Sequence, residues 1–395
     1  MAYAGEATSL ERLGARIPNS IAFFPWVSID EALTVGPLRL IPYERGEQPG
    51  NGDHVAQADI DGVLRAYALS KGEVVSGATL MEYGEWRLGQ EADASVRSQL
   101  FRARELVAFA ALAERRLFLG HFEYCNFDTY SFVVQHYQAG HTGAFSFATR
   151  RRDGGTKHQW TANDFAFQKP SHVDAYACMQ FDHAFVGALL QADEAGTLPY
   201  EAIVEFDRAN TDSQDVPTHA EMVLTKSAFE YLFNIGQAVN EFVEALRVAV
   251  RGRGSDDAPV GPLEQRWREA RPNASRPLEA WAREFCDARG GAAHGQKRGG
   301  ERFVWSEQAH LAFASILLPL LVKQRLQGPS FPVPERDALE LERIEDYLMY
   351  DPFSVADPMQ HPWNRVYDER VLGEVTRRGL RREMEKIDWA NLPKE

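Results

Sequence analysis

The chain has few of the features that identify secreted, membrane-spanning or metal-binding proteins. Its three cysteines, Cys125, Cys178 and Cys286, are far apart and odd in number, which favours a reducing compartment over a disulfide framework or a zinc cluster. The N-terminus has no basic region followed by an apolar run, so no signal peptide is expected. The most apolar segment, 309–322, is too short to cross a bilayer. We therefore expect a cytoplasmic protein with no membrane partner.

Positive charge is also scarce. Lysine and arginine total 43 against 57 aspartate and glutamate residues, a net charge of −14. Such a balance argues against coating nucleic acid through bulk electrostatics, but it leaves room for a local basic site. The motifs H-E-x-x-H, G-x-S-x-G and G-x-x-x-x-G-K-[ST] are absent, which makes a zinc or Ser/His/Asp hydrolase a remote alternative.

Length and patterning predict an α+β protein with two domains and an appendage. A chain of 395 residues is too long for one ordinary core, and no repeat or low-complexity tract is visible. Residues 1–195 are expected to form a mixed α/β domain. Short apolar or alternating runs predict strands at 21–27, 33–41, 62–70, 129–138, 144–150 and 159–168, with a hairpin at Gly140. Helices are expected at 94–116 and 176–191.

Two groups of residues in this first domain are candidate ligands. The spacing of His121, His136 and His141 matches no common zinc pattern, so we expect ordinary strand and loop histidines, with no metal and no cofactor. A basic run that includes Arg150, Arg151, Arg152 and Lys157 is most often a solvated turn. In a chain this acidic, it is also a candidate contact for RNA phosphates.

Residues 199–327 read as an all-α bundle. A helix is expected at 200–209, and Thr218 with Glu221 fits a capping box at the start of a long helix. Its apolar residues recur at steps of three and four from Leu224 to Ala249, which indicates one buried face along a single helix. After an exposed link at 251–260, helices are expected at 262–270 and, very apolar and kinked by Pro319, at 306–326. Residues 328–395 form a C-terminal extension that begins with an acidic helix at 336–350.

The stretch WAREFCDARGGAAHG, residues 281–295, is the most informative part of the chain. Leu278, Trp281, Phe285 and Ala288 share one helical face, whereas Glu279, Arg283 and Asp287 can pair along another. Ser275 is expected to cap this helix, with Pro277 in its first turn. The glycine pair 290–291 is expected to end it.

Arg289 is then the last side chain of the helix, and His294 follows five residues later. In an unbroken helix the two would point about 140° apart, but a turn at the glycines would let them converge on one anion. A permanent cation beside a group that titrates near neutral pH suits phosphodiester chemistry. The alternative is an arginine stabilising a helix C-terminus, followed by an ordinary loop histidine.

The helices of 199–327 resemble the HEPN superfamily, and within it the ApeA-like HEPN proteins of bacteria. The segments FDRANTDSQDVPTHAEMVLTKSAFEYLF (206–233) and WAREFCDARGGAAHG carry the resemblance, the second through its R-x4-H-G motif. It covers about a third of the chain. Many active members have a polar residue after the arginine, where this chain has Gly290.

The resemblance implies a metal-independent endoribonuclease that acts as a homodimer, with Arg289 and His294 of both protomers at one composite site. A toxin or anti-phage effector that cleaves RNA, tRNA included, is the role it suggests. Asp287 and Glu284 are candidate supporting residues, with pairing to Arg283 the expected role of Asp287, and Lys297 and Arg298 are candidate RNA contacts. The alternative from another class is a non-catalytic HEPN dimerisation or ligand-binding module whose first domain senses a ligand or partner.

Overall fold

The chain folds into two compact units that are not continuous in sequence. The first comprises Met1–Ala108 and Cys125–His183, and the second comprises Phe109–Tyr124 and Ala184–Glu395. The computed structural model describes residues 19–49, 55–69, 72–118, 124–140, 144–150, 152–153, 156–162, 166–173, 177–250, 261–294, 303–354, 362–363 and 365–386. Along this described part, no helix combines the length and the apolar composition that crossing a bilayer requires.

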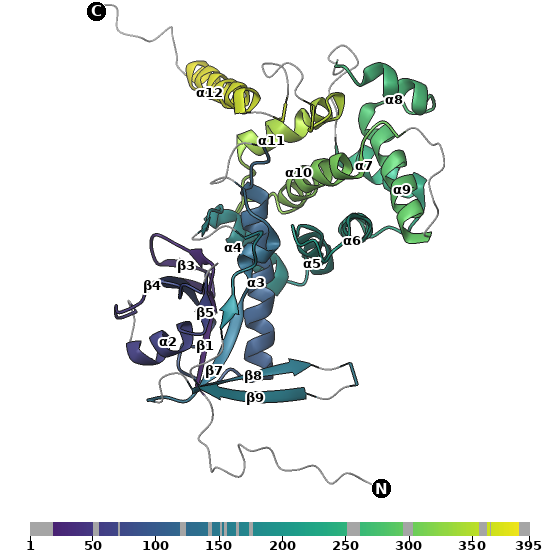
Figure 1. Ribbon diagram of the computed structural model, residues 1–395. Helices are drawn as coiled ribbons and strands as arrows, with labels where there is room; N and C mark the ends of the chain where they lie inside the picture. The colour runs from purple at the N-terminus through teal and green to yellow at the C-terminus, as the bar shows by residue number, and fades with distance from the viewer. Residues whose placement is uncertain are drawn as a thin grey trace, which may run out of the picture. The chain divides into compact units, whose positions relative to one another are not determined.

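An antiparallel sheet forms the core of the first unit (Figure 1). Its strand order is β3-β4-β6-β1-β7-β8-β9. The strands are β1 (Asn19–Phe24), β3 (Leu33–Val35), β4 (Leu38–Glu44), β6 (Gly77–Tyr83), β7 (Val133–Tyr137), β8 (Ala144–Arg150) and β9 (Thr156–Ala162). Two short parallel pairs accompany the sheet: β10 (Phe167–Gln168) with β5 (Tyr67–Ala68), and β11 (Ala177–Cys178) with β2 (Val27–Ser28). The central strand β1 reads NSIAFF and is almost wholly buried, as expected of a strand covered on both faces.

The mixed α/β character of the first unit is confirmed, but several expected strands are divided or replaced. The run 33–41 is a hairpin of β3 and β4, turned at Gly36, whose φ of 55° suits glycine. The expected strand at 62–70 was wrong: most of it lies in helix α2 (Gln57–Leu64), and only β5 remains extended. The expected hairpin at Gly140 is confirmed, because β7 pairs antiparallel with β8. The long helix α3 (Ala94–Glu114) also agrees with prediction.

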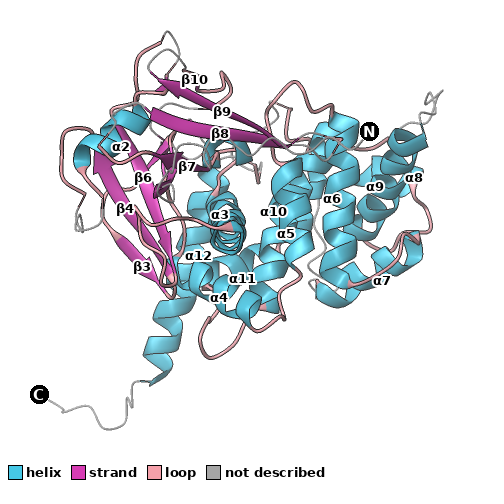
Figure 2. Ribbon diagram, turned by 90° about the horizontal axis from the view of Figure 1, so that it is seen from below, coloured by secondary structure: helices cyan, strands magenta, loops and turns pink. Residues whose placement is uncertain are grey.

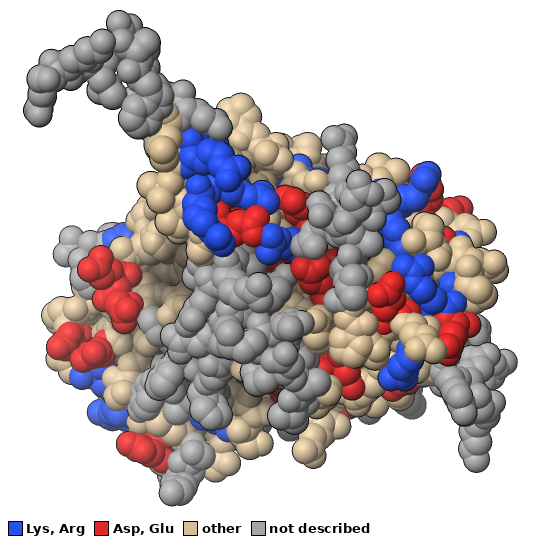
Figure 3. All heavy atoms as spheres, turned by 90° about the horizontal axis from the view of Figure 1, so that it is seen from above, with Lys and Arg blue, Asp and Glu red and all other residues tan. Residues whose placement is uncertain are grey.

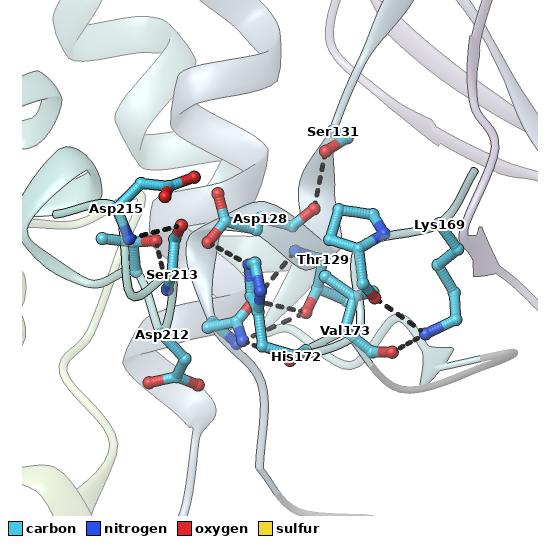
Figure 4. A network of polar contacts seen from close by, with 12 residues as sticks. Asp128, Thr129, Ser131, Lys169, His172, Val173, Asp212, Ser213 and Asp215 are labelled. Carbon is cyan, nitrogen blue, oxygen red and sulfur yellow. Dashed lines mark hydrogen bonds and ion pairs between the residues drawn. The ribbon is translucent and has the colours of Figure 1, made fainter. Parts of the chain in front are cut away.

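A polar network fixes one loop of the first unit (Figure 4). Asn126 caps the 3-10 helix η2 (Phe127–Tyr130) by accepting from the backbone N–H of Thr129 at 3.0 Å. The amide of Asn126 also donates to the carbonyl of His172 at 2.9 Å, and the ring of His172 lies 2.9 Å from a carboxylate oxygen of Asp128. One buried asparagine therefore joins a tight turn to a loop more than forty residues away.

The second unit is helical. It contains α4 (His183–Glu194), α5 (Tyr200–Ala209), α6 (Thr218–Phe233), α7 (Val239–Ala249), α8 (Glu264–Ala270), α9 (Pro277–His294), α10 (Glu307–Arg325), α11 (Glu335–Glu342), the 3-10 helix η4 (Ile344–Met349) and α12 (Arg365–Lys386). Helix α6 packs against α5, α9 and α10, and α7 packs against α9 (Figure 2).

The single long helix expected from Leu224 to Ala249 is in fact two helices. Helix α6 ends at Asn234, which adopts the left-handed conformation with φ 52°. The backbone N–H of Ile235 then bonds to the carbonyl of Glu230, a Schellman-type end that satisfies the last turn. The apolar spacing continues across this break because α6 and α7 both pack on α9.

The expected helix starts have mixed outcomes. The capping box of Thr218 and Glu221 was wrong, because α6 begins at Thr218 after Pro217 and has no side-chain cap. Helix α10 begins one residue after the expected start, and Ser306 caps it by accepting from the N–H of Ala309 at 3.1 Å, a cap that was not predicted. Pro319 lies inside α10, as expected.

Helix α12 carries a concentration of arginine side chains, visible as a blue patch in Figure 3. Arg378 pairs with Glu342 at 3.2 Å and with Glu374 at 2.8 Å, and Arg382 pairs with Glu335. The pairs with Glu342 and Glu335 tie α12 to α11, whereas the pair with Glu374 lies within α12. Arg377 and Arg381 are exposed.

Replacing Asn126 by alanine is expected to lower the free energy of unfolding by about 1–3 kcal/mol, because the side-chain cap of η2 is lost and the carbonyl of His172 loses its donor. Urea denaturation of the wild type and of Asn126→Ala measures this change. Ser131→Ala, which removes one partly exposed hydroxyl bond nearby, is the control and should cost less than half as much. Equal costs would contradict the role given to Asn126.

Candidate functional site

Helix α9 begins as the sequence predicts, with Pro277 in its first turn. Ser275 lies just before this turn, but its role is the reverse of the expected cap. Its backbone N–H and its hydroxyl both donate to the carboxylate of Glu279, each at 2.9 Å. The start of α9 is therefore fixed by a carboxylate within its first turn, where a negative charge also interacts well with the helix dipole.

The predicted apolar face of α9 is confirmed. Leu278, Trp281, Phe285 and Ala288 are all buried. The rings of Trp281 and Phe285 stack with centroids 5.0 Å apart, and Phe313 of α10 meets Trp281 edge-on at 4.7 Å. This packing holds α9 rigidly as far as its fourth turn, one residue before Arg289.

The polar face of α9 is only partly as expected. Arg283 pairs with Glu279 at 3.1 Å and also donates to the side-chain oxygen of Asn240 at 3.2 Å. Asp287 was expected to pair with Arg283, and this is wrong: its partner is Arg271, at 2.6 Å. Asp287 therefore connects α9 to the end of α8.

Glu284 is fully buried, on the same side of α9 as Ala288, which follows it by four residues. Its carboxylate accepts from the backbone N–H of Trp305 at 2.8 Å and lies 3.5 Å from the ring of His310 and 3.9 Å from Arg271. These contacts fix the residues that lead into α10. Both candidate supporting carboxylates, Glu284 and Asp287, thus have identified partners other than Arg289.

The glycine pair does not end the helix, contrary to expectation. Helix α9 continues through Gly290 and Gly291 to His294. Arg289 and His294 are therefore about 140° apart around the axis and about 7.5 Å apart along it. One helix alone does not bring the two to the same point. The side chain of His294 is outside the described residues.

The Arg289 side chain is partly buried, and its Nε has no hydrogen-bond partner among the described residues. One turn earlier, burial raises the pKa of the Cys286 thiol to about 11, an effect that the positive charges of Lys226 and Arg289 oppose. Two acidic groups act on the same thiol, and each has a cation of its own: Glu230 pairs with Lys226 at 2.8 Å, and Asp287 pairs with Arg271. Neither of these two carboxylates is therefore paired with Arg289.

The remaining candidates are dispersed. Arg150 and Lys157 belong to the β8–β9 ladder of the first unit, and Arg152 is exposed in the turn between these strands. Residues Arg151, Lys297, Arg298, His121 and His141 lie outside the described residues. His136 shares a hydrogen bond of 2.8 Å with the hydroxyl of Ser20. In the described ranges no group of three or more His, Cys, Asp and Glu side chains is placed to hold a metal ion.

A pocket in the second unit was missed by the sequence analysis. Its cavity measures about 380 Å³, and its polar lining includes Arg115, Tyr124, Asp212 and Glu221. Burial, followed by the nearby charge of Asp212, raises the pKa of Glu221 to about 7. These residues come from three separate segments of the chain, so no local spacing could reveal them. The one signal was Glu221 itself, which the sequence analysis had assigned to a cap.

Gly290→Ala distinguishes a continuous helix from one that ends at the glycines. A Cβ at Gly290 would meet no described atom within 4 Å, and alanine is favoured over glycine inside a helix by up to about 1 kcal/mol. We therefore expect the thermal midpoint to rise. Gly261→Ala is the opposite control, because its Cβ would lie 2.5 Å from Cβ of Met349. A fall in the midpoint for Gly290→Ala would show that α9 ends before the glycine.

Glu221→Gln tests the raised pKa of Glu221. A carboxyl with a raised folded-state pKa contributes stability that is complete below its unfolded value of 4.5 and is lost as the pH rises through about 7. Glutamine mimics the protonated form at every pH. The wild type should therefore lose stability relative to Glu221→Gln between pH 5 and pH 8, as measured by urea denaturation. A difference that does not change with pH would refute the shift.

Comparison of the chain with protein-family models, with curated proteins and with solved structures gives no match. The resemblance to HEPN proteins therefore rests on the two quoted segments of the sequence.

Proposed function

We propose that this protein is a metal-independent endoribonuclease of the HEPN kind, in which Arg289 and His294 act on the RNA phosphodiester. The observation that carries the proposal is the state of Arg289. Its guanidinium sits at the end of a rigidly packed stretch of helix, and its Nε has no partner among the described residues. A histidine follows in the next turns of the same helix.

The order of the helices supports the proposal in part. A short helix α5, an arginine-bearing helix α9 and a very apolar helix α10 follow one another as the HEPN resemblance implies, whereas the two helices α6 and α7 stand in place of its one long capped helix. The buried face of α9 meets α6, α7 and α10, so this helix is central to the bundle.

The chemistry needs no bound metal, because RNA supplies its own nucleophile. A histidine removes the proton from the 2′-hydroxyl, whose oxygen attacks the adjacent phosphorus. Arg289 holds the nonbridging oxygens through paired N–H bonds as negative charge develops on them. A second histidine gives a proton to the departing 5′-oxygen, and the products are a 2′,3′-cyclic phosphate and a 5′-hydroxyl.

A homodimer would provide the second histidine. Since an unbroken α9 directs Arg289 and His294 about 140° apart, a site that uses both on one phosphate is most simply completed by a second copy of the helix. We further propose that cellular RNA, tRNA included, is the substrate in the cytoplasm, and that the protein serves as a toxin or anti-phage effector. Exposed arginines on α12, such as Arg377 and Arg381, are further candidates for RNA contact.

A non-catalytic bundle that binds a ligand is the second candidate. Gly290 stands where many active HEPN proteins have a polar residue, and the second unit contains a pocket whose lining has no residue in common with the Arg289 region. Absence of RNA cleavage by a folded dimer would favour this alternative.

RNA cleavage by purified full-length protein tests the nuclease. Wild type, Arg289→Ala and His294→Ala are incubated with total tRNA in EDTA, and the product ends are identified. We expect cleavage to 2′,3′-cyclic phosphate ends by the wild type, and a loss of about 100-fold or more in each variant. The matched controls are Arg268→Ala and His219→Ala, which replace an exposed arginine and an exposed histidine of the same unit and should retain activity.

Three results would refute the proposal. The first is no RNA cleavage by a wild type that is folded and dimeric in sedimentation. The second is cleavage that survives in both Arg289→Ala and His294→Ala. The third is an activity that depends on a metal that EDTA removes.

A further inference from the structure

The pocket of the second unit has the size of a small-molecule site. Its volume of about 380 Å³ lies in the range of about 300–1,000 Å³ typical of ligand pockets. Its described lining comes from residues 115–118, Tyr124, the loop after α5, the first turn of α6, the first half of α10 and Phe353. All of these segments belong to one compact unit.

Two aromatic rings on this lining are accessible to a ligand. Phe118 and Phe353 meet edge-on with centroids 5.7 Å apart, and they are 48% and 54% exposed. Phe118 also meets Trp363 edge-on at 5.8 Å, so its ring is held from a second side. Its backbone has φ 66°, a conformation that a bulky residue rarely adopts and that is often found at ligand sites. Rings held in this way offer apolar faces on which a planar base can stack.

The carboxyl of Glu221 is the hydrogen-bonding group that distinguishes this pocket. It lies in the first turn of α6 and is partly buried, and no described residue donates a hydrogen bond to it. Burial is the larger of the two causes that raise its pKa to about 7, so most of the group is ionised at pH 8. Two N–H donors from a ligand would stabilise the carboxylate, because hydrogen bonds to the charged form replace lost solvation.

Guanine is the nucleobase whose edge matches a carboxylate. Its N1–H and its N2 amino group are adjacent donors, and the two oxygens of Glu221 can accept from both at once. Adenine and cytosine present a donor beside an acceptor, and uracil presents one donor between two acceptors, so each would place an acceptor against the carboxylate. Thr218 and Gln308 line the same pocket and can donate to the carbonyl O6 of guanine.

The contacts of α10 relate the pocket to the region of Arg289. The ring of His310 lies 5.7 Å from that of Phe285, whereas Phe313, one turn later on α10, lies 4.7 Å from Trp281, one turn earlier on α9. Helix α10 therefore runs antiparallel to α9. Its first turns, which line the pocket, are directed toward the end of α9 that bears Arg289.

We propose that this pocket binds a guanine base, with N1–H and the N2 amino group donating to Glu221 and the ring stacked on Phe118 or Phe353. The base can belong to a free nucleoside or nucleotide or to an unpaired guanosine of RNA, because the recognised edge is the same. Neither Arg289 nor His294 is needed for this contact. Guanine binding and RNA cleavage can therefore succeed or fail independently.

Isothermal titration calorimetry with three nucleosides tests the proposal. Guanosine, inosine and adenosine are titrated into the full-length protein at pH 8.0, and none of them carries a phosphate that Arg289 could bind. Inosine differs from guanosine only in lacking the N2 amino group. We expect guanosine to bind about tenfold or more tightly than either of the others. Absence of guanosine binding, or equal binding of the three, would overturn the proposal.

Two variants assign the preference to the pocket. The amide of Glu221→Gln offers one acceptor beside one donor, which complements adenine and opposes guanine. This variant should bind guanosine about tenfold or more weakly than the wild type and should prefer adenosine, whereas Glu201→Gln, at an exposed carboxylate of α5, should behave like the wild type. A Glu221→Gln variant that still prefers guanosine contradicts the assignment. Should it fail to fold, the wild-type nucleoside series still decides the question.

Two oligonucleotides then distinguish the sources of the base. Both are nine-residue oligouridylates, one with a central guanosine and one with a central inosine, titrated into His294→Ala to prevent cleavage. If the base comes from RNA, the guanosine oligonucleotide should bind at least tenfold more tightly than guanosine, and inosine should remove that gain. If it comes from a free nucleotide, the oligonucleotide should bind no more tightly than guanosine. Both results support a guanine site.

Discussion

The stacking of Trp281 on Phe285 is the contact on which the second unit depends most. These two rings also meet Phe229 of α6, Phe242 of α7 and Phe313 of α10, so one turn of α9 is in contact with three other helices. Burial of two such large side chains contributes several kcal/mol, roughly 2–3 for each ring. Because Arg289 follows Phe285 by one turn, the same packing determines where its guanidinium lies.

A buried carboxylate complements this aromatic core. Glu284 can remain in an apolar interior only because the N–H of Trp305 and the side chains of His310 and Arg271 surround it. The backbone of Trp305, just before α10, is therefore fixed to α9. A carboxylate five residues before Arg289 need not serve that arginine: here it fixes the backbone at Trp305.

Much of the bundle was predictable because burial repeats with the period of a helix. The apolar face of α9 and the bounds of α5 both followed from local patterns. Features that depend on a single backbone conformation or on distant partners did not. The stripe of apolar residues carried on past Asn234 although the backbone turned there, and the partner of Asp287 lay on another helix. The position of Arg289 on α9 was predictable from the sequence. The pocket lined by Arg115, Asp212 and Glu221 was not, because its residues come from three separate segments of the chain.

The division into units has a practical consequence for anyone who wishes to study the bundle alone. Residues 109–124 belong to the second unit, although they precede strands β7, β8 and β9 of the first unit in the chain. A fragment cut at residue 199, where the sequence suggests a boundary, would lack Arg115, Phe118 and Tyr124 and would leave part of the bundle surface bare. A truncation at that boundary would therefore produce an incomplete folding unit. Recombinant work should retain α3 and the residues that follow it.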